Sequence, residues 1–343
     1  MMVIERRKSS LAATAFVAVL SLAVATPAAS QEARPAPGEF LGAVLISDDA
    51  QAASEFYAAL FGWDMEQAKD GGFAVWHKGR MIAGISPLRD ANEDVEESFW
   101  LVGLAVEDVD AALQAAKDAD GKIYEQAQRV SDYGKFAVVA DHQKAPVLLI
   151  EPGIKSLGRS KGHGSWVWAE LWTDDVEDAV TFYGNVIGVQ HDTTDRGGKT
   201  YHLFSSQDEP RAGIVMIPPE LEKVEPGWAP YVAVTDLGAS LAKVKELGGR
   251  VVFPDAHTAL GPDQELVRTR GSEIGILEIA PDEGAVMDGL GTVARREAAR
   301  SGRDIGAAAW YGRAISAGRV EETAGNSTKE ASGLVVSAAA YRA

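Results

Sequence analysis

The sequence contains no cysteine, and after residue 30 it contains no long apolar run. The first absence excludes disulfides, thiolate metal ligands and cysteine nucleophiles. The second excludes a bilayer-spanning helix in the body of the chain, because such a helix needs about 20 apolar residues. The hydrophobic fraction of 46% is still enough to bury a core, and 343 residues suffice for two domains of ordinary size.

Positive charge is also scarce, and the formal net charge is -17. The first 30 residues carry two more basic than acidic residues and the segment after residue 282 carries one more, so the body between them carries about -20. Such a surface repels phosphate backbones and anionic lipids. We therefore expect no nucleic-acid partner, and no membrane partner once the leader is removed. The acidity favours solubility over a specific cation-binding role.

Residues 1–30 have the pattern of a secretory signal peptide. A basic start at residues 6–8 precedes an apolar run at residues 11–25, and small residues follow at 28–30. This order predicts cleavage between Ser30 and Gln31 and an exported protein, periplasmic or secreted. The alternative is an N-terminal membrane helix that is never cut.

One sequence pattern occurs twice in the body of the chain. Five landmarks recur in the same order at offsets of 126 to 129 residues, which indicates a gene duplication. They are Phe56-Tyr57 with Phe182-Tyr183, Ala83-Gly84-Ile85 with Ala212-Gly213-Ile214, Val106 with Val234, Gly121 with Gly249, and Pro152 with Pro281. The predicted organisation is a first module at 38–152, a linker at 153–164, a second module at 165–282 and a low-complexity, largely disordered tail at 283–343.

Each copy divides again into two halves with the order strand, helix, strands. An Asp pair after the first strand supplies the helix cap, and Gly62 or Gly188 ends that helix. A second strand–helix unit begins near residue 99 in the first copy and near residue 230 in the second. The expected fold class is α+β, with two βαβββ halves in each module.

An Asp-Asp turn, a helix ending F-Y-x-x-x-x-G and a V-x-D turn before the next helix stand in both copies. This pattern resembles the vicinal oxygen chelate family, the glyoxalase/bleomycin-resistance/dioxygenase superfamily, over residues 38–282. The resemblance implies two tandem modules that pair within one chain, each with paired βαβββ units forming a curved mixed sheet that makes a cup around a small molecule. Members include isomerases, dioxygenases and metal-free antibiotic binders, so the fold does not decide the function.

Metal-dependent members of that family bind the ion through His, Gln or Glu on the inner strands. The resemblance maps three such places in each module onto Gly42, Leu101 and Leu148, and onto Trp168, Ala229 and Leu277. None of these side chains can bind a metal, and a shift of one residue would add only Glu278. The six histidines show no His-x-His or His-x-x-x-His spacing. We therefore expect no metal and no cofactor.

The strand that opens the second module offers a candidate binding wall. Strand alternation places Trp166, Trp168, Glu170 and Trp172 on one face, and the resemblance implies that Trp168 faces the cup. Indoles and a carboxylate suit a planar aromatic or cationic ligand. The alternative is that these side chains pack the interface between the modules.

Two further observations bear on this wall. The first module has Phe40, Gly42, Val44 and Ile46 on the matching face, so polar chemistry is expected only in the second module. His202 lies within a predicted strand, where it either faces the cup or has one ordinary hydrogen-bond partner.

Three functions remain open. The first is a protein that binds or sequesters a small molecule without a metal, and the unsuitable residues at the ligand places favour it. The second is a glyoxalase-like lyase or isomerase whose metal ligands lie elsewhere or which needs no metal. The third and weakest is a scaffold for another exported protein.

Overall fold

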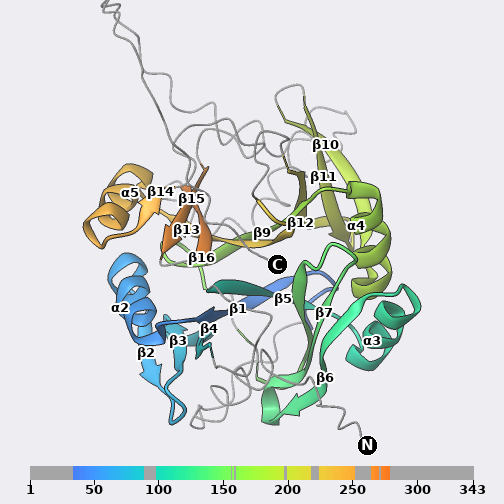
Figure 1. Cartoon of the computed structure of the whole chain (residues 1–343), viewed down its shortest axis with the longest axis horizontal. Coiled ribbons are helices and arrows are strands. Elements are labelled where there is room, and N and C mark those ends of the chain that lie inside the picture. The colour runs from blue at the N-terminus through green and yellow to red at the C-terminus, as the bar shows by residue number, and fades with distance from the viewer. Residues whose placement is uncertain are drawn as a thin grey trace, which may run out of the picture.

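The computed structural model describes residues 34–88, 98–155, 157, 160–196, 199–217, 224–251, 264–269 and 272–278. The predicted leader at 1–30 and tail at 283–343 therefore lie outside the described residues. Within the described part, two eight-stranded sheets lie one above the other, with helices at their sides (Figure 1). No helix in that part is long and apolar enough to cross a membrane.

The first sheet is built from residues 40–152. Its elements are β1 (Phe40–Ser47), α2 (Ala50–Phe61), β2 (Asp64–Gln67), β3 (Phe73–His77), β4 (Arg80–Pro87), β5 (Phe99–Ala105), α3 (Val109–Asp118), β6 (Lys122–Val130), η1 (Ser131–Tyr133), β7 (Gly134–Ala140) and β8 (Pro146–Pro152). The strand order is β2-β3-β4-β1-β5-β8-β7-β6.

The second sheet is built from residues 166–278. Its elements are β9 (Trp166–Thr173), α4 (Val176–Tyr183), η2 (Gly184–Gly188), β10 (Gln190–Arg196), β11 (Lys199–Ser206), β12 (Glu209–Met216), β13 (Gly227–Val234), α5 (Leu237–Glu246), β14 (Arg250–Val251), β15 (Gln264–Thr269) and β16 (Ser272–Glu278). The order β10-β11-β12-β9-β13-β16-β15-β14 repeats that of the first sheet.

Both sheets are mixed, and each consists of two βαβββ halves. In the first sheet β1 pairs parallel with β4 and β5 pairs parallel with β8, while β1 and β5 run antiparallel and join the halves. In the second sheet β9, β12, β13 and β16 repeat these pairings. The expected fold class, α+β with two tandem modules of paired βαβββ units, is confirmed.

Local sequence explains where the helices begin and end. Asp49 caps α2 by accepting a hydrogen bond from the Ala52 amide at 2.9 Å, and Asp175 caps α4 by accepting one from the Asp178 amide at 3.1 Å. Gly62 ends α2 in the left-handed conformation, with φ of 69°, which glycine adopts without strain.

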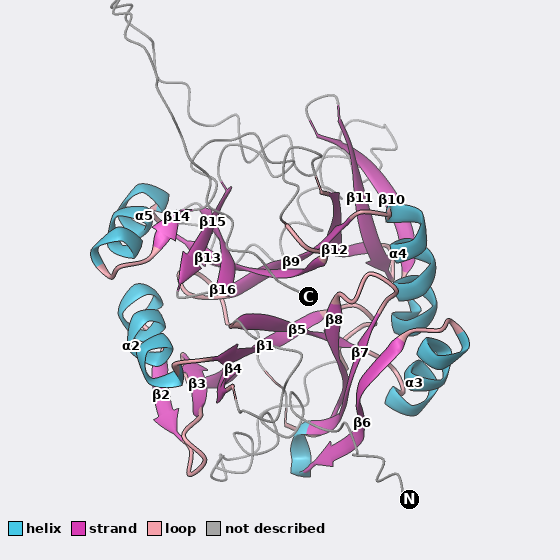
Figure 2. Ribbon diagram, viewed as in Figure 1, coloured by secondary structure: helices cyan, strands magenta, loops and turns pink. Residues whose placement is uncertain are grey.

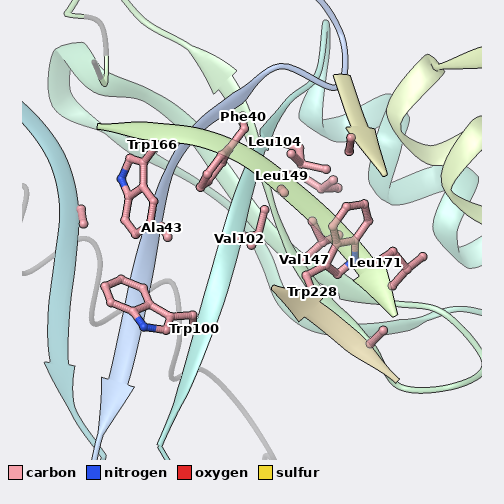
Figure 3. Packing of buried hydrophobic residues seen from close by; sticks show 14 of the residues in the cluster. Phe40, Ala43, Trp100, Val102, Leu104, Val147, Leu149, Trp166, Leu171 and Trp228 are labelled. Atoms are coloured by element: carbon pink, nitrogen blue, oxygen red, sulfur yellow. The ribbon is translucent and has the colours of Figure 1, made fainter. Parts of the chain in front are cut away.

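The two modules pack against each other through one shared apolar core (Figure 3). Its centre is aromatic: the Trp166 ring lies 5.2 Å from that of Trp63 and 5.4 Å from that of Trp100. Helices α2 and α5 lie together at one side of this core, and α3 and α4 lie together at the other (Figure 2). The Tyr183 hydroxyl donates to the Ala145 carbonyl at 2.6 Å, which adds a buried polar contact between the modules.

A β-bulge in β9 changes the face on which Trp166 lies. Tyr231 pairs with Trp168 and the next residue, Val232, pairs with Trp166, so Val167 is an extra residue in β9. Trp166 therefore packs between the modules, and its indole N–H donates to the Ile82 carbonyl at 2.9 Å. The expectation that Trp166 shares a face with Trp168 is wrong, and the interface alternative holds for this residue.

The first module contains the same irregularity. Phe40 pairs with Leu104 and Gly42 pairs with Gly103, so β1 also carries an extra residue near its start. Phe40 consequently joins the core between the modules, with its ring 5.4 Å from that of Trp166. The bulge thus supplies one aromatic side chain from each module to the interface.

Candidate functional site in the second module

Each sheet also has a face turned away from the other module, and we call these faces cup 1 and cup 2. Cup 2 is formed by β9, β11, β12 and β13. Its buried apolar and aromatic residues are Trp172, Tyr201, Leu203, Val215, Ile217 and Tyr231, and its partly exposed residues are Val167, Trp168, Val224 and Ala229.

A buried carboxylate lies at the centre of cup 2. Glu170 is 0% exposed. The Tyr201 hydroxyl donates to its Oε1, and the Tyr231 hydroxyl donates to its Oε2 at 2.8 Å. Two donors from β11 and β13 thus supply the hydrogen bonds that a buried carboxylate requires.

Two small residues make room for this arrangement. Glu170 pairs with Gly213 on one neighbouring strand and with Ala229 on the other. A Cβ atom at position 213 would overlap the Tyr201 hydroxyl and would lie 2.9 Å from Glu170 Cγ. Glycine at 213 is therefore needed for Tyr201 to reach the carboxylate.

An indole group orients one of the two phenols. The Trp168 N–H donates to the Tyr201 hydroxyl at 3.1 Å, and because an indole only donates, it directs the phenolic hydrogen toward Glu170. Trp172 and Tyr231 lie in the same buried cluster. Burial, reinforced by the Glu170 carboxylate, raises the pKa of Tyr231 well above its usual value, so Tyr231 stays a donor at every physiological pH.

Thr194 adds another polar group to the same surface. It lies opposite Tyr201 in the β10–β11 pairing and is buried. Its Oγ1 has no hydrogen-bond partner among the described residues. A buried hydroxyl without a partner is costly, so Thr194 is a candidate contact for a ligand or a water in cup 2.

In the described residues, the cup 1 strands that correspond to those of cup 2 (β1, β3, β4 and β5) carry no polar cluster of this kind, and the buried carboxylate of Glu125 lies on the edge strand β6. The fully buried residues of cup 1 form an apolar cluster of β1, β5, β7 and β8 side chains. Strand register matches the two cups position by position. The pairs, cup 2 first, are Trp168 and Gly42, Glu170 and Val44, Trp172 and Ile46, Thr194 and Ala68, Tyr201 and Gly72, and Tyr231 and Gly103.

His202 lies on the opposite face of β11 from Tyr201. It shares that face with Phe204, which belongs to the core between the modules. The Nδ1 atom of His202 lies 3.0 Å from Nε2 of His191. His202 therefore lies outside cup 2, on a strand, with His191 as its hydrogen-bond neighbour.

The residues at the family's metal positions do not fit a metal. Leu101 and Leu148 do face cup 1, yet neither carries a donor atom. In the first module Leu148 pairs with Gly103, whose equivalent in the second module is Tyr231. Tyr231 pairs with Gly275, so the third metal position of the second module is Gly275 and the expected Leu277 is wrong. The described residues contain no group of three or more His, Cys, Asp or Glu that could hold an ion.

Sequence reasoning found part of cup 2 and missed the rest. It identified Trp168, Glu170 and Trp172, which the structure brings together, and it included Trp166 and His202, which lie elsewhere. It missed Tyr201, Tyr231 and Thr194, since they lie on other strands and no local spacing links them to Glu170. Comparing the repeats would have helped, because Tyr201 and Tyr231 stand where the first copy has glycine.

Comparisons with known proteins agree with this fold. The chain is 29% identical over 248 residues to "Putative glyoxylase CFP32" of Mycobacterium bovis, covering 70% of this chain and 94% of that protein. It is 29% identical over 272 residues to "Anthracycline biosynthesis protein DauV" of Streptomyces sp., covering 75% and 98%. The 2,3-dioxygenase LapB from Pseudomonas sp. KL28 has the same fold, with a TM-score of 0.52 at 10% identity over 72% of this chain and 94% of that one.

Residues 40–146 match the family model described as "Glyoxalase/Bleomycin resistance protein/Dioxygenase superfamily". This match covers the first module, and the second module repeats its topology strand by strand. By this match the first module belongs to the superfamily, and the second module shares its fold.

Proposed function

We propose that this protein is an exported member of the superfamily that binds a small planar molecule in cup 2 without a metal, and that it prefers a positively charged one. One observation carries the proposal: the buried Glu170 held between Tyr201 and Tyr231, beneath the partly exposed Trp168 and Ala229. A pocket of apolar walls with a few convergent polar groups is the usual form of a small-molecule site.

The chemistry of the cluster supports a cationic ligand. The phenol donors are neutral, so they stabilise the carboxylate without cancelling its charge. Stacking on Trp168 contributes about 0.5–1.5 kcal/mol and a charge-assisted hydrogen bond to Glu170 about 1.5–3 kcal/mol. Together these favour a cationic aromatic ligand by roughly 30- to 2,000-fold over a ligand that makes neither contact.

The names of the relatives are consistent with a planar ligand. DauV is named for anthracycline biosynthesis, and anthracyclines are planar polycyclic compounds. A flat aromatic system suits the face of the Trp168 ring. This similarity supports the ligand class and does not identify the compound.

The test is ligand binding by tag-free mature protein, followed by tryptophan fluorescence and calorimetry. The probes are a matched pair of anthraquinones, one with an amine side chain and one with a neutral side chain of the same size. Glu170→Gln should abolish the preference for the amine, and Trp168→Phe should weaken both probes. The control Glu55→Gln changes an exposed carboxylate on α2 and should change nothing. Equal affinity for both probes in wild type and in Glu170→Gln would rule the site out.

A glyoxalase-like lyase or isomerase is the second candidate. The name "Putative glyoxylase CFP32" favours it, and a buried carboxylate beneath partly exposed side chains is suited to accept a proton. The assay is conversion of 2-oxoaldehyde hemithioacetals by metal-free protein and by protein supplied with manganese or zinc. Turnover that disappears in Glu170→Gln would establish the enzyme; binding without turnover would establish the first proposal.

Export is the remaining part of the proposal. The basic start, the apolar run and the small residues at 28–30 support it. Two contacts that anchor the start of the first module come from residues after the predicted cut, so cleavage would keep them. The Pro37 carbonyl accepts from Ser206 Oγ at 2.6 Å, and Arg211 lies 3.9 Å from the Glu39 carboxylate. N-terminal sequencing of protein from fractionated cells should find Gln31 first. Retention of Met1 in cytoplasmic protein would contradict export.

A further inference from the structure

A pair of imidazoles lies on the β10–β11 hairpin, outside both cups. His191 Nε2 and His202 Nδ1 are 3.0 Å apart, the ring planes differ by 7° and the ring centroids are 5.2 Å apart. Because the centroids are much farther apart than the two nitrogens, the rings lie edge to edge, with those nitrogens facing each other. This orientation differs from face-to-face stacking, in which the nitrogens would not converge.

The hairpin fixes this separation through its backbone. Thr193 pairs with His202 and His191 pairs with Phe204, so the two histidines are diagonal neighbours on one face of the antiparallel pair. On its other edge β11 pairs with β12, which holds it in the sheet. The eleven-residue spacing carries no sequence signature of a metal site, and only the strand register brings the rings together.

Each ring turns one nitrogen toward the other, so two imidazole nitrogens converge at one point on this face of the hairpin. Neutral imidazole nitrogen is a preferred ligand of zinc, copper and nickel ions, whereas magnesium and calcium ions prefer oxygen ligands.

We propose that His191 and His202 form a two-imidazole site for a divalent ion of the zinc, copper or nickel type on the hairpin face opposite cup 2. The ring that donates the hydrogen bond moves its proton to its other nitrogen, so that both facing nitrogens offer lone pairs to the ion. His191 is exposed, and it can rotate toward the ion while water fills the remaining coordination positions.

The site would act on cup 2 through the hairpin. A metal that bridges β10 and β11 ties together the two strands that carry Thr194 and Tyr201 on the other face. Ion binding should therefore stabilise the hairpin selectively. This proposal stands apart from the proposed function, because it requires no ligand in cup 2.

Thermal unfolding and hydrogen exchange of the tag-free mature protein test the site. In chelator-treated protein, zinc or nickel should raise Tm by several degrees and slow amide exchange in β10 and β11, and EDTA should reverse both effects. Magnesium at the same concentration should have no such effect, which separates the site from general cation attraction to an acidic protein.

The first module provides matched substitutions. Strand register puts Met65 and Phe73 at the positions of His191 and His202, and both are apolar contacts of the shared core. The double variant His191→Met/His202→Phe should keep the metal-free fold and lose the zinc effect. His142→Asn removes a different surface histidine, which is hydrogen-bonded to Asp178, and this variant should retain the zinc effect.

Copper supplies a second readout that does not depend on stability. Electron paramagnetic resonance of the copper-loaded protein should show two coordinated nitrogens in wild type and one in His191→Asn. The single variant is at an exposed position, so it is informative even if the double variant fails to fold. No zinc effect in wild type, or an undiminished effect and unchanged nitrogen count in His191→Asn, would overturn the proposal.

Discussion

Cup 1 and cup 2 have the same strand order and the same register, yet they differ at every matched polar position. Cup 2 carries a carboxylate, two phenols, two indoles and a hydroxyl, whereas cup 1 carries only glycine, alanine, valine and isoleucine at those places. The two copies therefore share one backbone plan but differ in the chemistry of this face, which is polar at its centre in cup 2 and apolar at the matched places in cup 1.

The glycines of cup 1 do not leave it empty. A Cβ atom at Gly103 would lie 2.7 Å from Ile150 Cδ1, so the space that Tyr231 fills in cup 2 is taken by an aliphatic side chain in cup 1. Phe136 and Leu148 are also completely buried there. Cup 1 is thus a packed second core, and a ligand would have to displace it.

The largest effect is expected from placing the carboxylate of cup 2 in cup 1. Val44→Glu buries a charge where Gly72 and Gly103 stand in place of the two tyrosines, so no phenol can donate to it. A buried charge without partners costs at least about 3–5 kcal/mol. Urea unfolding should show this loss. The reverse change, Glu170→Val, should lower the free energy of unfolding by less. A Val44→Glu protein as stable as wild type would contradict the proposed difference between the two cups.

A cavity in cup 1 should cost nearly as much without touching the ligand. Leu148→Ala removes a completely buried side chain from its apolar cluster, which typically costs about 3 kcal/mol. Calorimetric unfolding should reveal the loss, while the affinity of the folded fraction for an anthraquinone amine stays at the wild-type value. A parallel loss of affinity would mean that cup 1 takes part in binding.

Filling cup 2 should weaken binding with little loss of stability. Ala229→Leu copies Leu101 of cup 1 beside Glu170, on a partly exposed position that can accept added volume. We expect affinity to fall about tenfold or more, corresponding to roughly 1.4 kcal/mol. Titration calorimetry measures this, with Leu101→Ala as the mirror control. Unchanged affinity would place the ligand elsewhere.

The smallest effect concerns the histidine pair, which is a Met–Phe pair in the first module. The folded state lowers the pKa of His202, so the unfolded state binds more protons and stability falls as the pH drops below about 6.5. Between neutral and mildly acidic pH, the Tm of His202→Phe should therefore decrease less than the Tm of the wild type. An identical pH profile in both proteins would show that the pair contributes nothing to acid sensitivity.

Much of the architecture was predictable because it depends on interactions between residues that are close in the sequence. Asp49 and Asp175 cap helices and Gly62 ends one, through contacts within a few residues of each other. Glu170 and Trp168 were recognisable as candidates since strand alternation is a local rule. That rule failed at Trp166, where one extra residue in β9 reverses the faces, and neither Val167 nor its neighbours signals a bulge.

The duplicated plan, the α+β class, the absence of thiol chemistry and the apolar character of cup 1 could all be predicted from the amino-acid sequence, because repeats, periodicity and composition are properties of the chain. The partners of Glu170, the place of Trp166 between the modules and the meeting of His191 with His202 became visible in the folded structure. These contacts join residues on different strands, and strand pairing, bulges and register set their distances. The physical reason is that side-chain chemistry belongs to each residue, whereas convergence of side chains depends on how the sheet is assembled.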